Sequence, residues 1–432
     1  MHDYDARMPL RILKLNLPRA VYWFAALAFA LRLVARLFYT GIADFWLYGY
    51  GFFFELAQSI AQGQGFSVGG PPTAFRVPLY PILLAGLTLG HQAFWPIAIA
   101  QSAIGAGIAI CAAQLACRLF PGPFAHRASI LSAAITALYP YYIIHDTALQ
   151  ETGFFTLLTI VAVLMLVQAV RDGKISSALL AGLVLGLDVL TRPTIAPFAA
   201  VAVLWLLWRR RVRAGVACAL LLAVTVLPWV WRNDVVIGDP TLSTETGIEF
   251  WAGNSGYLFS HFPEESSDVS KSAATDSLTA QDHLELDRIA DNEAATDHWY
   301  LHKGLVYIRS HPKQTIVDGF HKIAVGFGWL PAPRRGLAMD LVEIFSYGPV
   351  MLLGLWGMFR HRAHWREDFM IYLLFATFML VTAIFWAQTS HRAYLDVYWI
   401  VFGAGALAET VFAPRKGPLL ATPQESAPTA RA

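Results

Sequence analysis

Charged residues are scarce in this chain of 432 residues, at 14% of the composition. A soluble protein of this length would carry about 25% charged residues. Hydrophobic residues make up 56%, and they gather in runs of roughly 20 residues, each long enough to cross the hydrocarbon core of a bilayer. The sequence therefore predicts an all-α polytopic membrane protein.

Cysteines, nucleotide-binding loops and metal-ligand clusters are also scarce or missing. Cys111, Cys117 and Cys218 all lie inside apolar runs, so no extracellular disulfide framework is predicted. The GQGFS stretch lacks the strand context of a phosphate-binding loop, and no His and acidic residues near the outer face have ligand-like spacing. The Arg clusters flank apolar runs, which argues against nucleic-acid binding. We therefore expect no cofactor, and a divalent metal is not indicated.

Apolar runs predict about ten transmembrane helices. They lie near residues 20–41, 94–117, 128–144, 152–170, 176–190, 194–208, 214–231, 337–359, 369–387 and 394–412. The segment 78–90 is not counted, because about 13 residues are too few to cross. With this count, the RRRVR run at 209–213 falls on the N-terminal side, and the positive-inside rule places both termini in the cytoplasm. No cleavage pattern follows the basic N-terminal segment, so we expect the first span to be retained.

These spans divide the chain into four predicted parts. Residues 1–231 form a transmembrane core whose first outer loop, 42–93, carries the catalytic groups. Residues 232–336 form a small outer cap, 337–413 the C-terminal transmembrane helices, and 414–432 a disordered cytoplasmic tail.

The first outer loop is the most distinctive stretch of the sequence. Residues 48–62 alternate Phe, Leu and Ile with Glu55 and glutamines, which predicts a helix lying in the membrane interface. A Gly/Pro-rich turn follows, and an Arg76-x-Pro-x-Tyr80-Pro corner opens a second, short apolar helix. We expect the rest of the chain to hold this loop at the membrane surface.

Ionisable side chains from distant parts of the chain fall at one membrane level near the outer face. Such groups usually face a cavity or one another. A carboxylate there could deprotonate an acceptor hydroxyl or amine, while cations hold a lipid-linked phosphate and stabilise it as a leaving group. Our candidate bases are Asp44, the first choice, and Glu55, the second. The candidates for substrate binding are Arg76, Tyr80, Asp146, Glu151, Arg192, Arg232, His391 and Arg392.

Each candidate also has a purely structural interpretation. Asp44 could cap the helix that follows it, Glu55 could be the wet edge of an interfacial helix, and Glu151 could complement a helix dipole. Arg76 could contact lipid headgroups, and Arg192 could cap the end of a helix. Arg32 and Arg36, in the outer half of the first span, could snorkel to headgroups and are assigned no role.

Several segments together resemble GT-C glycosyltransferases. They are AQSIAQGQGFS with TAFRVPLYPILLAG from residue 57 onward, ALYPYYIIHDTALQET (137–152), GLVLGLDVLTRPT (182–194), LPWVWRNDVVIGDPTLSTETGIEFWAGNS (227–255) and a weaker SHRAYLDVYWIVFGAGAL (390–407). More narrowly, they are similar to the bacterial branch related to protein O-mannosyltransferases and lipid A aminoarabinose transferases.

The resemblance implies an enzyme in the bacterial inner membrane. It would move a sugar from a polyprenyl-phosphate donor to a glycan, lipid or protein acceptor at the periplasmic face, with inversion, in contact with membrane lipids. In such enzymes the first outer loop carries the catalytic acid, and the later outer loop, where Asp146 and Glu151 lie here, contributes a second carboxylate.

This chain departs from the family at the catalytic acid. Gly49 stands where relatives usually place it. Three alternatives stay open: an insertion lets Asp44 reach the site, Glu55 substitutes, or the protein is an inactive or repurposed member. Two other classes of protein stay open: a transporter or flippase of lipid-linked sugars, and a noncatalytic membrane assembly subunit.

Overall fold

The computed structural model describes residues 17–40, 51–262, 265, 267–328, 336–386 and 389–411. Within these ranges the chain is helical, and the β structure is limited to one isolated bridge between Ser67 and Pro72. Asp44 and the predicted tail 414–432 lie outside the described residues.

Helices occupy every predicted span. They are α1 (Arg19–Ala35) with the π-helical η1 (Arg36–Thr40), α4 (Phe94–Leu119), α5 (Ala125–Leu138) with α6 (Pro140–His145), α7 (Thr152–Asp172), α8 (Ile175–Val189), η3 (Pro193–Ile195) with α9 (Ala196–Trp208), α10 (Val212–Ile237), α16 (Gly336–His361), η5 (Arg362–His364) with α17 (Trp365–Ile384), and η6 (Thr389–Arg392) with α18 (Ala393–Val411). Five segments are long and apolar enough to cross a membrane: Arg19–Phe38, Phe94–Leu119, Thr152–Asp172, Val212–Ile237 and Glu343–Ile384. The predicted fold class, an all-α polytopic membrane protein, is confirmed.

The run 128–144 differs from the prediction, because it is two helices and not one. Tyr139 lies between α5 and α6 in an extended conformation, with φ −65° and ψ 109°. A residue before proline is driven out of the helical region by the proline ring. Pro140 therefore ends α5 and starts α6 at its first turn, while the apolar pattern continues through the break.

The first outer loop contains two short helices, α2 (Gly51–Ala61) and α3 (Leu79–Thr88). The 10 residues of α3 span about 15 Å, half of the hydrocarbon core. Phe53 and Phe54 of α2 are buried against α3 and α4, and the Phe53 ring packs edge-on against Tyr80 at 5.2 Å. The apolar face of α2 thus holds α3 in place.

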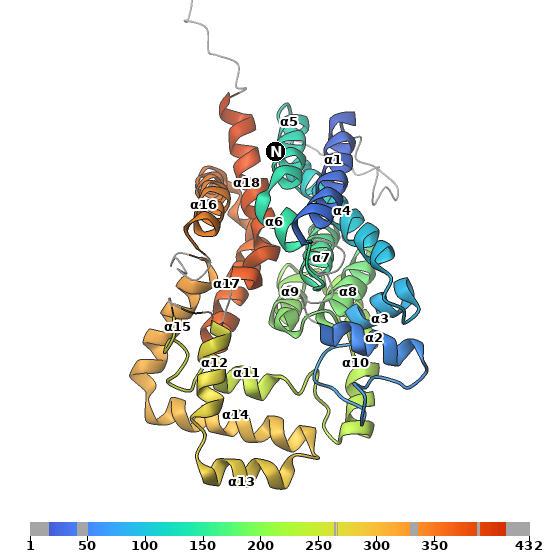
Figure 1. Ribbon diagram of the computed structural model, residues 1–432. Coiled ribbons are helices and arrows are strands. Elements are labelled where there is room, and N and C mark those ends of the chain that lie inside the picture. Colours follow the sequence, from blue (N-terminus) through green and yellow to red (C-terminus); the bar gives the residue numbers. More distant parts are fainter. Residues whose placement is uncertain are drawn as a thin grey trace, which may run out of the picture.

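Glycines let the membrane helices approach closely. A Cβ added to Gly357 of α16 would lie 2.2 Å from the carbonyl oxygen of Phe402 in α18, and one added to Gly182 of α8 would lie 2.2 Å from that of Cys218 in α10. Small residues at helix contacts are the usual means of packing inside a bilayer. The helix α18 is buried along most of its length and runs beside α16 (Figure 1).

A layer of helices covers one end of the bundle: α11 (Thr246–Ala252), α12 (Ser267–Asp276), α13 (Ala280–Ile289), α14 (Glu293–Ser310) and α15 (Pro312–Gly326). Figure 1 draws α11, α13 and α14 along the lower edge, on the side of α2 and α3. Glu293, the first residue of α14, accepts hydrogen bonds from the Ala74 amide at 2.9 Å and from the Thr244 hydroxyl. This layer is therefore tied directly to the first outer loop.

Candidate active site

Glu151 and Arg192 form an ion pair between two helix ends. Glu151 directly precedes α7, and Arg192 lies between α8 and η3 in an extended conformation that Pro193 enforces. The Arg192 guanidinium donates to Glu151 Oε1 from Nη2 at 2.5 Å and from Nε at 3.1 Å. The Arg-Pro step thus turns this side chain away from the helix axis and toward the carboxylate.

Glu151 stays ionised although it is buried. Burial acts to raise its pKa, but the Arg192 guanidinium outweighs burial and the pKa is lowered. Its second oxygen, Oε2, is buried and accepts no hydrogen bond from any residue that the structure describes. A buried acceptor left in this state is unfavourable unless another group, such as a bound ligand, completes it.

Arg76 forms a second ion pair, with a carboxylate that the sequence analysis did not single out. Arg76 Nη1 lies 2.5 Å from Oε2 of Glu245, which directly precedes α11. Two hydrogen bonds hold the segments together, from the Thr244 amide to the Ala74 carbonyl at 3.1 Å and from the Ser243 hydroxyl to the Phe75 carbonyl at 2.7 Å. The only sequence signal for Glu245 was its place in the segment 227–255 that resembles GT-C enzymes.

Burial raises the pKa of Glu245 to about 7, against the opposing charge of Arg76. A carboxyl group with such a pKa exchanges protons readily near neutral pH, which is the property of an efficient general acid or base. The pKa of Glu245 is therefore well suited to a general acid or base at neutral pH.

The two ion pairs and His391 share one electrostatic environment, and we call Arg76, Glu151, Arg192, Glu245 and His391 the charge cluster. The Arg76 charge helps to lower the pKa of Glu151, and the Glu151 charge helps to raise that of Glu245. Burial and then the Arg192 charge lower the pKa of His391 to about 4. His391 is thus neutral at pH 7, so the arginines alone supply the positive charge.

A second group of polar side chains adjoins the charge cluster. Arg32 Nε lies 2.5 Å from Asp146 Oδ2, and Gln101 Nε2 donates to the Tyr80 hydroxyl at 3.3 Å. The pKa of Tyr80 is raised by burial and then by the charge of Glu151, which connects the two groups. The structure thus brings Arg76, Tyr80, Asp146, Glu151, Arg192 and His391 into one region.

Arg32 and Arg36, which the sequence analysis left without a role, lie inside the protein. Their side chains are 2% and 1% exposed, among the most deeply buried of the described residues. Arg32 turns inward because its carboxylate partner lies on the segment between α6 and α7. Both arginines therefore belong to the interior of the site region.

The structure does not bring Glu55, Arg232 and Arg392 to the charge cluster. Glu55 is exposed on α2, on the face opposite the buried phenylalanines. Arg232 donates to the carbonyl oxygens of Thr73 at 2.7 Å and Phe66 at 3.3 Å, and so fixes the first outer loop to α10.

Arg392 is fully buried in an ion-pair network of its own. Its Nη1 lies 2.8 Å from Oδ2 of Asp396, and its Nη2 lies 3.2 Å from Oε1 of Glu343. The guanidinium stacks 3.4 Å from the centre of the Tyr347 ring. These contacts join α16 to α18 and give Arg392 a structural place in the bundle.

The described residues hold no group of three or more His, Cys, Asp or Glu side chains arranged to bind a metal ion.

The charge cluster offers two guanidinium groups and one ionised carboxylate whose second oxygen accepts no hydrogen bond from the described residues. It also offers one carboxyl group that titrates near pH 7 and a neutral imidazole.

Part of the chain matches a known protein family by sequence. Residues 76–231 match the family described as dolichyl-phosphate-mannose-protein mannosyltransferase. The predicted GT-C resemblance is confirmed. The matched mannosyltransferase region begins at Arg76 and includes Tyr80, Asp146, Glu151 and Arg192. It supports an integral membrane glycosyltransferase of the GT-C kind.

No curated protein matches the chain by sequence. Among solved structures, the crystal structure of ArnT from Cupriavidus metallidurans bound to undecaprenyl phosphate is similar over 90% of this chain and 78% of that chain. The sequence identity is 14% and the TM-score is 0.39.

Proposed function

We propose that this protein transfers a sugar from a polyprenyl-phosphate-linked donor to a glycan, lipid or protein acceptor at the periplasmic face of a bacterial inner membrane. The observation that carries the proposal is the charge cluster, in which two ion pairs from four separate segments meet beside α3. Within it, the buried Oε2 of Glu151 accepts no hydrogen bond from the residues that the structure describes. The matched family is named for a donor of the same class, a sugar on a polyprenyl phosphate.

Arg76 and Arg192 would hold the phosphate of the donor. A guanidinium carries five N–H donors in a planar fork, so one group can bridge a carboxylate and a phosphate. As the bond from the anomeric carbon to the phosphate oxygen breaks, negative charge builds on the polyprenyl phosphate. Two fixed cations in a partly buried site stabilise that charge far better than water does.

The acceptor would attack the anomeric carbon directly. Its hydroxyl or amine gives a proton to a carboxylate base, the new bond forms on the face opposite the phosphate, and the configuration inverts. Glu151, with its open Oε2, would orient the sugar by accepting hydrogen bonds from its hydroxyl groups. Tyr80, Asp146 and His391 would complete the polar wall around the substrate.

Three carboxylates are candidates for the base. Asp44 is favoured by the sequence, because it lies in the first outer loop where relatives carry their acid. Glu245 is favoured by its pKa of about 7 and by its ion pair with Arg76. Glu55 is the weaker choice because its side chain is exposed on α2.

The test uses the purified full-length protein in nanodiscs with radiolabelled polyprenyl-phosphate hexoses and a membrane extract as the source of acceptor. Asp44→Asn, Glu245→Gln and Glu55→Gln are compared with the wild type. Removal of the base should lower transfer by about a hundredfold or more, and we expect this for one of the first two variants. A loss in Glu55→Gln alone would instead assign the base to α2.

Three results would contradict the proposal. If the wild type turned over none of the donors, the proposed enzymatic function would be wrong. Movement of lipid-linked sugar across the bilayer without transfer would indicate a flippase. An unchanged cellular phenotype in the triple variant of Asp44, Glu55 and Glu245 would indicate a noncatalytic assembly subunit.

A further inference from the structure

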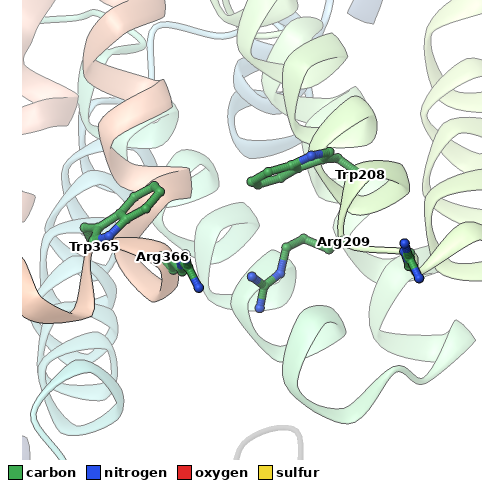
Figure 2. A pocket seen from close by; sticks show the side chains of 5 residues that line it. Trp208, Arg209, Trp365 and Arg366 are labelled. Carbon is green, nitrogen blue, oxygen red and sulfur yellow. The ribbon is translucent and has the colours of Figure 1, made fainter.

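A pocket of about 450 Å³ lies far from the charge cluster, and the described residues that line it are all tryptophan or arginine. They are Trp208, Arg209, Arg210, Trp365 and Arg366. Figure 2 shows Trp208, the last residue of α9, and Arg209 in the turn that follows on one side of the pocket. Trp365 and Arg366, which begin α17, lie on the other side. Because α9 has 13 residues, the pocket is about 20 Å from Arg192, which precedes the other end of this helix.

The pocket carries a concentrated positive charge. In the described part of the chain, Arg209, Arg210 and Arg366 take part in no ion pair, and no acidic residue lines the pocket. The nearest acid in sequence, Glu367, lies 4.0 Å from Arg171 instead. Three guanidinium groups around one cavity repel one another, and an anion that bridges them would remove this repulsion.

The backbone gives Arg210 a conformation that side chains rarely adopt. Its φ is +57°, in the left-handed region, and the Arg211 amide donates to the Leu206 carbonyl at 3.0 Å. This is the helix-ending turn in which glycine is usual, because any Cβ there is strained. The turn places three consecutive arginines at the end of α9, and two of them, Arg209 and Arg210, line the pocket.

The two tryptophans indicate that the anion belongs to the membrane. Trp208 is 65% exposed and Trp365 is 44% exposed, at the ends of helices that are otherwise apolar. Indole rings gather at the level of lipid headgroups, where one edge is apolar and the other is hydrated. A soluble phosphate would make no use of such walls, whereas a phospholipid would place its headgroup among the arginines and its glycerol and upper chains along the indoles.

We propose that this Trp/Arg pocket binds the phosphate headgroup of an anionic membrane phospholipid. The charge bias of the loops places this end of α9 on the cytoplasmic side, where juxtamembrane basic groups bind anionic lipids. The proposal is independent of the sugar-transfer function, because it uses the opposite end of the bundle.

The test counts lipids retained by the purified full-length protein, using native mass spectrometry after titration with phosphatidylglycerol or phosphatidylcholine. The wild type should retain phosphatidylglycerol preferentially. Arg209→Gln/Arg366→Gln should bind it about tenfold more weakly. Arg213→Gln/Arg360→Gln, which removes two exposed charges outside the pocket, should differ from the wild type by less than about twofold.

Arg209→Lys/Arg366→Lys separates the loss of charge from a loss of folding, and this variant should keep most of the binding. Equal retention of phosphatidylglycerol by the wild type and the Gln variant would overturn the proposal. Retention of phosphatidylcholine by the wild type to the same extent as phosphatidylglycerol would also overturn it. Displacement of the lipid by millimolar inorganic phosphate would show that the pocket takes a free phosphate and would overturn the assignment to a lipid.

Discussion

Replacing Gly105 by alanine should break the Arg32–Asp146 ion pair without changing either charged residue. A Cβ at position 105 would lie 2.1 Å from Arg32 Nε and 2.3 Å from its Cδ. Arg32 Nε is the atom that bonds Asp146, at 2.5 Å. Because the guanidinium is 2% exposed, the side chain has no solvent into which it can move.

The magnitude follows from two opposing effects. Alanine in place of glycine in a helix interior is favourable by about 1 kcal/mol. Separating a buried ion pair leaves an uncompensated charge and costs about 3–5 kcal/mol. The net effect should be a loss of about 2–4 kcal/mol, which the midpoint of thermal unfolding in one fixed detergent can measure.

Gly107→Ala is the matched control on the same helix. Its Cβ would lie 3.3 Å from Cδ1 of Leu157, a flexible side-chain end that can give way. Its unfolding midpoint should stay at or above that of the wild type. In an Asp146→Asn background, Gly105→Ala should cost less than alone, because the ion pair is already lost. Equal midpoints for Gly105→Ala and the wild type would refute the reasoning.

Four further predictions concern the pH dependence of transfer and of stability, the core, and metal dependence. If Glu245 is the base, transfer should rise with pH through about 7, where its carboxyl group ionises, and a profile that is flat there in the wild type would exclude it. The unfolding midpoint should fall as transfer rises. Burial raises the pKa of Glu245 from 4.5 to about 7, so the contribution of its protonated form to stability is lost as the pH rises through this range. Glu245→Gln should remove this pH dependence of the midpoint. Arg392→Gln should lower the unfolding midpoint because it leaves Asp396 buried without its partner, and Arg392→Gln/Asp396→Asn should recover part of the loss; an unchanged midpoint in the single variant would contradict the structural role. Chelation with EDTA should leave transfer intact, because arginines stabilise the leaving group, whereas a loss reversed by added divalent cation would show a metal requirement.

The sequence predicted the membrane helices well because hydropathy over some 20 residues is a local property. The run 152–170 becomes α7, Thr152–Asp172, and the short segment near 78–90 becomes the ten-residue α3. Where a local rule competed with hydropathy, the prediction was incomplete: Pro140 divides an apolar run that looks continuous.

The site was harder to predict because its contacts are not local. Arg32 was assigned no role, since nothing near it in the sequence reveals a partner 114 residues away. Glu245 escaped notice because Arg76, its partner, is 169 residues away. The topology predicts one membrane level for the ionisable groups, but which of them meet depends on helix packing.

The most direct test of the account measures release of polyprenyl phosphate by Arg192→Gln in nanodiscs, with Arg309→Gln, an exposed arginine of α14, as control. Arg192→Lys accompanies them to separate the loss of charge from the loss of the planar fork. If the charge cluster stabilises the leaving phosphate, Arg192→Gln should reduce release by about a hundredfold, Arg192→Lys should be intermediate, and Arg309→Gln should match the wild type. Release by a folded Arg192→Gln at the wild-type rate would contradict the assignment of the active site to this cluster.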